Sequence, residues 1–433
     1  MKYAQLLLLV ALFFTCVSVA QRSNSTRDSV REESMAALIN EALSRNPDIA
    51  VERDRVEAAR QKIPQESALP DPELIFKMME IPGLDFGNAT FANLELMQMV
   101  PFPTKLSTKR SLAELLLTHA SYGQKERIAM TTAEVKMAAA TLWYAREVLA
   151  LNQANQDILR RVLKAVETAY AVGNASQQDV LKSNIELAKT ISEETVLRSR
   201  TLGAENKLRE LLNRPSSIGI GRVSPGTGRV TLPPVEKLLS ASTLRRPMLA
   251  DDSLSIVEKE LALSLMKQEY LPDLKISLEY VRMPMAMENR WSFAAGITLP
   301  FSPWTLGKAS ARVQEGEADK RMSESMYVSR KNSVAAAIRT RYEEANGRAR
   351  QLDIYERSVL PQLRQSIAVM LTEYETGKTS FLMLLDSYRM YHEGIMAFAM
   401  ARMQYSEAIA ELEREVGVTD ISSLSSSGKE DSQ

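Results

Sequence analysis

Apolar residues near the C-terminus recur at alternating spacings of three and four. The series comprises Phe381, Leu384, Tyr388, Tyr391, Ile395, Phe398, Tyr405, Ile409, Leu412 and Val416. Only Arg402 interrupts it. A repeat of this kind sustained over about five heptads is typical of a coiled-coil seam against neighbouring helices. We therefore expect a helix over 378–416 that packs against others of similar length.

Glycine and proline are scarce between Pro103 and Pro215, where good helix formers dominate. The pattern predicts long helices over three further ranges, namely 104–171, 176–213 and 304–375. A continuous helix over the first range would be about 100 Å long. This length far exceeds the three or four turns of an ordinary globular helix, so it requires a special architecture.

Two short regions alternate with a period of two residues instead. Residues 290–299 alternate large apolar side chains with small or polar ones, and 275–281 do the same. Together they predict a β-hairpin over 275–299. An earlier region predicts a second hairpin over 73–100, although it alternates less cleanly.

The chain repeats itself with an offset of about 200 residues. The matching segments are Asn46-Pro47 with Arg246-Pro247, Leu69-Pro70-Asp71 with Leu271-Pro272-Asp273, Val100-Pro101-Phe102-Pro103 with Leu299-Pro300-Phe301-Ser302-Pro303, and Tyr170, Gly173 and Ser176 with Tyr374, Gly377 and Ser380. Each half is therefore one unit of helix, hairpin, very long helix, turn and long helix. We expect a first repeat over 21–217, a linker over 218–235, a second repeat over 236–417 and a disordered tail over 418–433.

Residues 1–20 have the composition of a secretory signal, with an early lysine, an apolar run and small residues before the cut. We expect cleavage before Gln21, which leaves no cysteine in the mature chain and excludes disulfides. The alternative is a lipoprotein with lipidated Cys16. The residue before this cysteine is not the small residue that lipoprotein processing requires.

The sequence has 54 basic and 54 acidic residues, and this balance excludes a basic nucleic-acid-binding protein. After the signal, no apolar run approaches the roughly 18 residues of a membrane-spanning helix. If the chain spans a membrane, it does so with strands. Two hairpins give four strands, which are too few to close a barrel, and in lipid every strand edge must be paired. Two copies would give eight strands and three would give twelve, and both numbers are allowed.

Motifs for catalysis or for cofactor binding are absent from the sequence. Gly377-Lys378-Thr379 lacks the earlier glycine and the preceding strand of a phosphate-binding loop. His119 and His392 are the only histidines, and neither has a second histidine at ligand spacing. We therefore expect neither an enzyme nor a cofactor.

Several segments resemble the TolC-type outer-membrane efflux family over nearly the whole chain. They are Leu69-Pro-Asp-Pro-Glu-Leu74, Val100-Pro-Phe-Pro-Thr-Lys-Leu106, Val359-Leu360-Pro361 and the paired Tyr-x-x-Gly-x-x-Ser turns. The resemblance implies a mainly α fold with a membrane β-barrel, in which three protomers share twelve strands and long antiparallel coiled-coil helices form a periplasmic α-barrel.

The same resemblance implies where the protein lies and what it binds. It implies the outer membrane of a Gram-negative bacterium, a large periplasmic part, a periplasmic adaptor (membrane fusion protein) and an inner-membrane pump of the RND or ABC type. It places Gly173 and Gly377 at the periplasmic tip. Family ducts commonly carry a pore-facing aspartate where Asp386 stands, and Asp179 is in the corresponding region of the first half. A second acidic residue common in the family is replaced here by Met383.

The cargo and one competing class stay open at this stage. The chain has 21 methionines, and Met283, Met285 and Met287 cluster in one hairpin loop. Thioether sulfur suits Cu(I) or Ag(I), although methionine also simply fills apolar surface. Metal, drug and peptide efflux are all compatible with this sequence. The competing class is a periplasmic coiled-coil scaffold without a pore, which would leave the two apolar hairpins unexplained.

Overall fold

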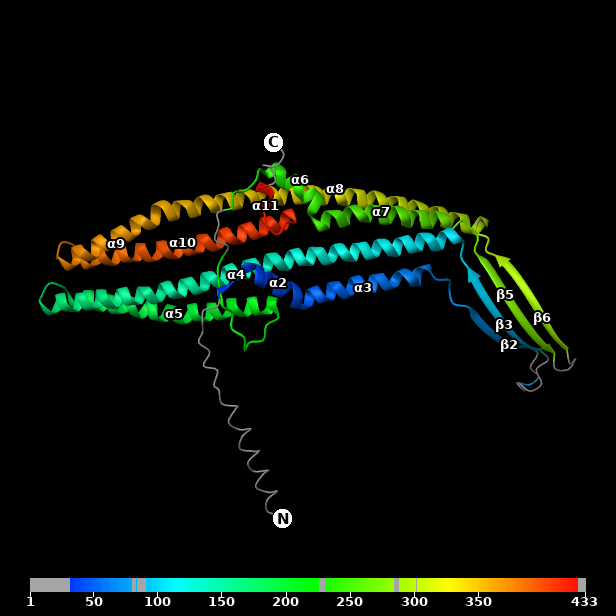
Figure 1. Ribbon diagram of the computed structural model, residues 1–433, viewed down its shortest axis with the longest axis horizontal. Helices are drawn as coiled ribbons and strands as arrows, with labels where there is room; N and C mark the ends of the chain where they lie inside the picture. Colours follow the sequence, from blue (N-terminus) through cyan, green and yellow to red (C-terminus); the bar gives the residue numbers. More distant parts are fainter. Residues whose placement is uncertain are drawn as a thin grey trace, which may run out of the picture.

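The computed structural model of the protein describes residues 32–79, 83, 91–225, 230–283, 288–300 and 302–426. The expected signal peptide, with Cys16 and the cleavage position before Gln21, lies outside these described residues. Met285 and Met287 lie outside them too. The molecule is elongated, with a β-sheet at one end and two helix-to-helix turns at the other (Figure 1).

The first repeat runs helix, helix, hairpin, helix, helix. After the short strand β1 (Glu32–Glu33), its elements are α2 (Met35–Arg45), α3 (Pro47–Ser67), β2 (Glu73–Met79), β3 (Phe91–Val100), α4 (Pro103–Ala171) and α5 (Gln177–Leu212). Helix α4 is continuous over 69 residues. Helices α3 and α5 pack along successive parts of it, on either side of the middle of the molecule (Figure 1).

The second repeat has the same order, which confirms the internal duplication. Its elements, together with the short strand before them and the short helix after them, are β4 (Arg222–Val223), α6 (Val235–Arg245), α7 (Pro247–Gln268), β5 (Leu274–Met283), β6 (Glu288–Ile297), α8 (Pro303–Ile354), the π-helical turn η3 (Tyr355–Val359), α9 (Leu360–Glu375), α10 (Phe381–Val416) and α11 (Ser422–Ser426). Helix α7 packs on α8 as α3 packs on α4.

The helix expected over 304–375 is interrupted, so this expectation is corrected. The backbone N–H of Leu360 donates to the carbonyl of Tyr355, five residues back, which is the π-helical spacing. Pro361 follows directly. A proline has no N–H and its ring crowds the carbonyl four residues earlier, and one wider turn relieves both problems. Helix α4 has no proline after Pro103 and runs through without a break.

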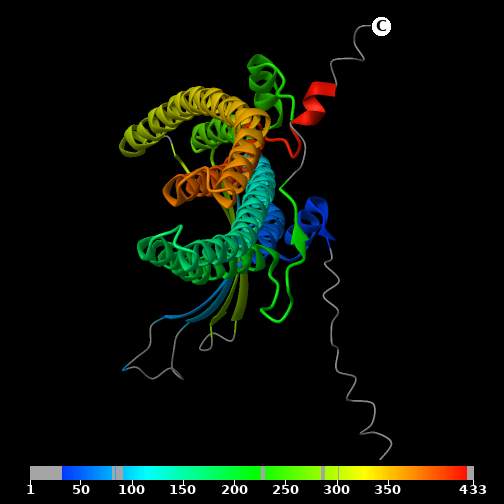
Figure 2. The same ribbon diagram turned by 90° about the vertical axis from the view of Figure 1, so that its left-hand side faces the viewer.

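Arg402, which interrupts the apolar series of α10, has a defined partner. Its guanidinium carbon lies 4.9 Å from the centre of the Trp143 ring on α4. A cation over the face of an indole is attracted by the negative face of the ring. A basic residue therefore fits between α10 and α4. Seen from the end that carries the turns, the paired helices form a curved layer (Figure 2).

The four long strands form one antiparallel sheet in the order β2-β3-β5-β6. Strands β3 and β5 join the hairpins of the two repeats. Two rows of facing residues are apolar across all four strands, namely Leu74, Leu96, Leu278 and Phe293, and Phe76, Leu94, Tyr280 and Trp291. The adjacent row on the other face is Ile75, Glu95, Glu279 and Ser292. Because side chains alternate along a strand, one face of the sheet is apolar and the other is more polar.

The apolar rows are open to the surroundings in the single protomer. Phe76, Trp291 and Phe293 are 62%, 68% and 69% exposed. Among the described helices, none combines the length and the apolar character that crossing a membrane requires.

The expected disordered tail is wrong for residues 418–426, while 427–433 lie outside the described part of the chain. Ile421 is completely buried, and its N–H donates to Glu413 Oε1 at 3.1 Å. Lys136 Nζ of α4 lies 2.6 Å from Glu413 Oε2. Apolar burial and this buried carboxylate hold the end of the chain against α4 and α10.

Candidate functional site

Each repeat ends its first very long helical segment in the same kind of turn. Gly173 follows α4 with φ +82°, and Gly377 follows α9 with φ +72°. In each turn the next N–H donates to a carbonyl five residues back, at 2.7 Å in the first and 2.8 Å in the second. A helix closed in this way needs a residue in the left-handed region, which glycine reaches without strain. The structure places both glycines where paired helices reverse direction.

The two turns differ in how the next helix begins. Ser176 Oγ accepts the N–H of Asp179 at 3.2 Å, and Asp179 Oδ2 accepts the N–H of Ser176 at 3.1 Å. This capping box satisfies two backbone donors at the start of α5. Ser380, at the equivalent position before α10, makes no side-chain cap. The carboxylate of Asp179 is thus engaged locally.

An apolar cluster joins the two helix pairs behind the turns. Its buried residues come from α4, α9 and α10 and are Leu159, Val162, Val166, Ile367, Phe381, Leu384, Leu385 and Tyr388. The rings of Tyr374 and Phe381 meet edge to face with their centres 6.4 Å apart. Burial raises the pKa of Tyr374, and the nearby charge of Asp179 raises it further. The two turns are therefore neighbours at one end of the molecule.

Arg389 and Glu186 connect α10 with α5. Nε and Nη2 of Arg389 donate to the two carboxylate oxygens of Glu186 at 3.0 and 2.9 Å. These bidentate bonds lower the pKa of Glu186, and they outweigh burial, which raises it. No sequence pattern signals this pair, because its members lie 203 residues apart and belong to no motif.

Asp386 lies on the exposed side of α10, three residues before Arg389. Glu186 is the main cause of the raised pKa of Arg389, and the charge of Asp386 adds a smaller part. The structure therefore places Asp386 beside the ion pair between α10 and α5. Asp179 lies in the capping box of the other turn, and no contact joins the two aspartates in the described part of the chain.

The histidines are packing residues. His119 of α4 lies between two carboxylates of α7, with Nδ1 2.7 Å from Asp251 and Nε2 3.2 Å from Glu258. His392 stacks on Tyr388, and burial lowers its pKa. Within the described ranges, no group of three or more His, Cys, Asp or Glu side chains is arranged to hold a metal ion.

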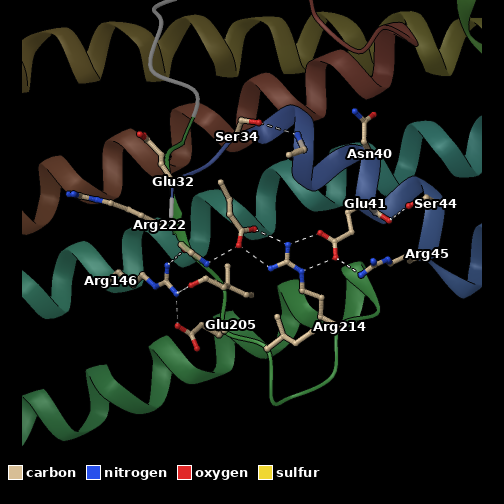
Figure 3. Close-up of a pocket in the computed structure, with 16 residues that line it drawn as sticks. Glu32, Ser34, Asn40, Glu41, Ser44, Arg45, Arg146, Glu205, Arg214 and Arg222 are labelled. Carbon is tan, nitrogen blue, oxygen red and sulfur yellow. Dashed lines mark hydrogen bonds and ion pairs between the residues drawn. The ribbon is translucent and has the colours of Figure 1, made fainter. Parts of the chain in front are cut away.

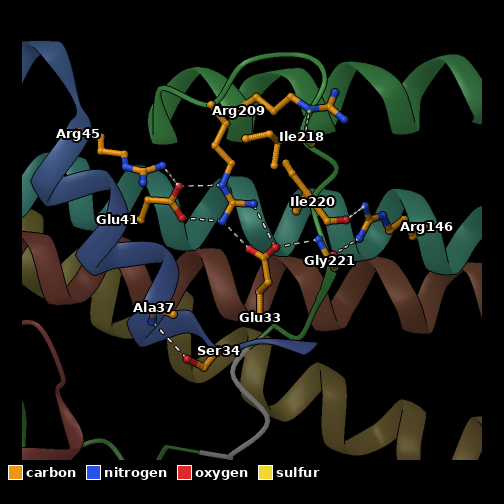
Figure 4. Close-up of polar contacts among 11 residues, drawn as sticks. Glu33, Ser34, Ala37, Glu41, Arg45, Arg146, Arg209, Ile218, Ile220 and Gly221 are labelled. Atoms are coloured by element: carbon orange, nitrogen blue, oxygen red, sulfur yellow. Dashed lines mark hydrogen bonds and ion pairs between the residues drawn. The ribbon is translucent and has the colours of Figure 1, made fainter. Parts of the chain in front are cut away.

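A polar pocket of about 1250 Å³ lies near the middle of the molecule, where β1, α2 and the segment after α5 meet (Figure 3). Arg214 lies at its centre (Figure 3). It binds Glu33 and Glu41, which are labelled in Figure 4, at distances from 2.6 to 3.0 Å. The hydrogen bonds to Glu41 and Glu33 raise the pKa of Arg214. Burial raises the pKa of Glu33, but its bonds from Arg214 and from the N–H of Gly221 leave it lowered.

A second arginine completes this network. Arg146 of α4 donates to the carbonyls of Gly221 and Ile220 at 2.5 and 2.9 Å (Figure 4). It also donates to Glu205 of α5 at 2.6 Å (Figure 3). Strand β4, within the expected linker, pairs in parallel with β1. The central charges of the pocket are paired with one another, so the network fastens the start of the first repeat to the end of that repeat and to the linker that follows it.

The sequence pattern of the outer membrane efflux protein family matches the chain twice, over residues 38–214 and 238–418. The chain belongs to this family. The two matches coincide with the two structural repeats. Membership confirms the resemblance identified from sequence and places the protein in the outer membrane of a Gram-negative bacterium, with a large periplasmic part.

Individual relatives agree with this assignment. The cobalt-zinc-cadmium resistance protein CzcC of Cupriavidus metallidurans is 22% identical over 276 residues, and the alignment spans 63% of this chain and 64% of that protein, less than two thirds of its length. The open state of the Neisseria gonorrhoeae MtrE outer membrane channel is similar with a TM-score of 0.75, at 18% identity and over 89% of each chain. The Campylobacter jejuni CmeC outer membrane channel is similar with a TM-score of 0.74, at 14% identity, over 92% of this chain and 89% of CmeC. These structures confirm the expected fold class.

Proposed function

We propose that this chain is the outer-membrane duct subunit of a tripartite efflux or export system, a passive conduit and not an enzyme. The observation that carries the proposal is the two-faced sheet. Its apolar rows include exposed Phe76, Trp291 and Phe293, while the opposite face carries Glu95 and Glu279. A barrel in a membrane needs an apolar face toward lipid and a polar face toward the lumen.

The assembly we propose is a homotrimer. Strands β2 and β6 are the two edges of the sheet. An unpaired backbone group in lipid costs several kcal/mol, so β2 of one protomer pairs with β6 of the next. Three protomers then close a twelve-stranded barrel surrounded by outer-membrane lipid. The curved layers of helices (Figure 2) form the wall of a periplasmic α-barrel in the same trimer.

The partners lie at the end of the duct that is remote from the sheet. The turns at Gly173 and Gly377 form this end (Figure 1). A periplasmic adaptor docks there and connects the duct to an inner-membrane pump of the RND or ABC type, which supplies the energy. Nucleic acid has no part in this function.

Asp386 lines the constriction of the duct, and Asp179 contributes less. Asp386 is exposed beside the ion pair of Arg389 with Glu186, whereas the Asp179 carboxylate caps a helix. Threefold symmetry brings three copies of Asp386 around one axis. A ring of carboxylates attracts cations and disfavours anions.

The cargo is small molecules or metal ions. Two observations favour a metal cation. One is the similarity to CzcC, whose name assigns it to cobalt, zinc and cadmium resistance. The other is the group of methionines at one hairpin, expected from sequence as a loop cluster: Met283 is the last residue of β5, and Met285 and Met287 lie outside the described residues.

One preparation tests the function against the scaffold alternative. Membranes that contain the protein are washed with high salt and then extracted with detergent. If the protein is the duct, it is released only by detergent. The released protein then has a trimeric mass by light scattering and shows stepwise conductance in planar bilayers. Release by salt alone as a monomer without conductance would establish the periplasmic scaffold instead.

A further inference from the structure

The exposed side of α10 presents sulfur and carboxylate groups in alternation. Between residues 381 and 400, the exposed residues are Leu382, Met383, Asp386, Arg389, Met390, Glu393 and Met400. Five of these seven are methionine or acidic, in the order Met383, Asp386, Met390, Glu393 and Met400. We call these five residues the α10 stripe. Its three methionines are 58%, 53% and 43% exposed.

The spacing aligns the stripe along the helix. Its first four members follow one another at intervals of three, four and three residues, and the fifth lies two turns further on. Side chains three and four residues apart are neighbours on one face of a helix. At a rise of about 1.5 Å per residue, the stripe is roughly 25 Å long. The first four groups are therefore neighbours on one face, and the fifth lies about 10 Å further along the same helix.

The one basic residue on this exposed side of α10 is engaged by a neighbouring helix. Arg389 is bound in a bidentate ion pair to Glu186. Neither Asp386 nor Glu393 forms a salt bridge with any residue in the described ranges. Both carboxylates act on Arg389 through their charge, but among the described residues neither is fixed in an ion pair beside the thioethers. At the turn, Met383 is held by a weak hydrogen bond from Thr379 Oγ1 to its sulfur, 3.5 Å long.

The first repeat provides an internal comparison. The turn glycines and serines are offset by 204 residues, so the five positions that correspond to the stripe in α5 are Asp179, Lys182, Glu186, Lys189 and Val196. Helix α5 contains no methionine at all, and two of these positions are basic. The two repeats therefore share the backbone, and α10 carries an alternation of sulfur and carboxylate that α5 lacks.

We propose that the α10 stripe is a series of weak binding stations for a soft monovalent cation of the Cu(I) and Ag(I) class. This inference rests on the proposed duct, with the stripe facing its lumen. Thioether sulfur binds such ions in preference to hard ions, and carboxylates concentrate cations along the path. Each station offers few ligands, and passage requires binding that is weak and distributed over several sites.

The test measures protection of each methionine from oxidation. Hydrogen peroxide converts exposed methionine to its sulfoxide, and a bound silver ion blocks the sulfur lone pair. The detergent-solubilised full chain is oxidised with and without silver nitrate in chloride-free buffer, and sulfoxide is measured by peptide mass spectrometry. We expect silver to slow the oxidation of Met383, Met390 and Met400 but not of Met322 and Met326, which are exposed on α8.

Two variants sharpen the result. Asp386→Asn with Glu393→Gln removes the carboxylates but keeps every sulfur, and we expect most of the protection to be lost. The matched change Asp54→Asn with Glu57→Gln on α3 should leave protection unchanged. Equal protection of the stripe and of the α8 methionines, or protection by Zn²⁺ but not by silver, would overturn the proposal.

The same preparation separates this inference from the proposed function. Potassium conductance in planar bilayers reports the duct and does not depend on silver. If the protein conducts but silver does not protect its methionines, the proposed duct stands and the proposed binding by the α10 stripe is overturned. If the protein does not conduct, the proposed duct is overturned, and so is the role of the α10 stripe as a transport path.

Discussion

Asn46 and Arg246 occupy equivalent positions in the two repeats and make the same contact with different chemistry. Asn46 Nδ2 donates to the carbonyl of Leu211 at 3.0 Å, and Arg246 Nη1 donates to the carbonyl of Glu415 at 2.8 Å. Both carbonyls lie in the last turn of a long helix, where backbone acceptors lack helical partners. In both repeats, therefore, the junction between the two short helices is fastened to the end of the last long helix, although the side chains that make the contact have diverged.

Substitution of two turn glycines should separate backbone strain from steric conflict. Gly377 has φ +72° with nothing within 4 Å of an added Cβ, whereas Gly417 has φ +80° and its Cβ would lie 2.9 Å from Cα of Arg246. We expect Gly377→Ala to cost about 1 kcal/mol from strain alone. Gly417→Ala should cost about 3 kcal/mol, because overpacking adds to strain. Thermal unfolding in detergent measures both.

Gly347→Ala is the control for these variants, since this glycine is helical and open, and alanine there should be neutral or stabilising. Gly316 is unsuitable as a control because its Cβ would lie 2.7 Å from Met266 Sδ of α7. Equal losses of stability at Gly377 and Gly417 would contradict the distinction between strain and clash.

The capping box of α5 should contribute to stability in the first repeat only. Ser176→Ala removes the acceptor for the N–H of Asp179 and should destabilise the protein by about 1 kcal/mol. Ser380→Ala is the matched control, because Ser380 makes no side-chain cap. Chemical or thermal unfolding of both variants gives the comparison. A loss as large at Ser380 as at Ser176 would disagree with the observed caps.

The ion pair between Arg389 and Glu186 should make the contact of α5 with α10 sensitive to acid. Because the folded protein lowers the pKa of Glu186, the stabilisation is complete above the usual glutamate pKa and is lost as pH falls through the lowered value. We expect Glu186→Gln to destabilise the protein by about 1 kcal/mol at pH 7. The effect is small because Arg389 is half-exposed and solvent screens the pair. At a pH well below the lowered pKa, wild type and variant should unfold alike.

The control for this experiment is Glu57→Gln, which removes an exposed carboxylate from a pair within α3. It should change stability little at either pH. A difference between wild type and Glu186→Gln that stays constant down to strong acid would exclude the ion pair as its source.

Asp386 should set the ion selectivity of the duct. Asp386→Asn keeps the shape of the side chain and removes its charge, so cation preference and block by trivalent cations from the periplasmic side should both fall. Trimer assembly should be unchanged, because the residue is exposed and outside the apolar cluster. Planar-bilayer recordings of reversal potential measure the effect, with Asp54→Asn as the control. A variant that conducts and blocks like wild type would remove Asp386 from the constriction.

The sequence alone determined the parts of this protein that depend on local periodicity. Spacings of three and four residues in α10 and period-two alternation in β6 follow from the geometry of a single element. Duplication then predicted a second copy of each unit, and the glycines at 173 and 377 marked the turns because the left-handed conformation is a local requirement.

Only the tertiary structure decided which distant residues meet. The pairs Arg389 with Glu186 and Arg402 with Trp143, and the burial of Ile421 after the last long helix, have no signature in sequence. The π-helical turn before Pro361 likewise depended on how the chain relieved one steric conflict inside a packed helix. These contacts join residues far apart along the chain, and their free energy exists only once packing has brought the partners together and removed water from between them.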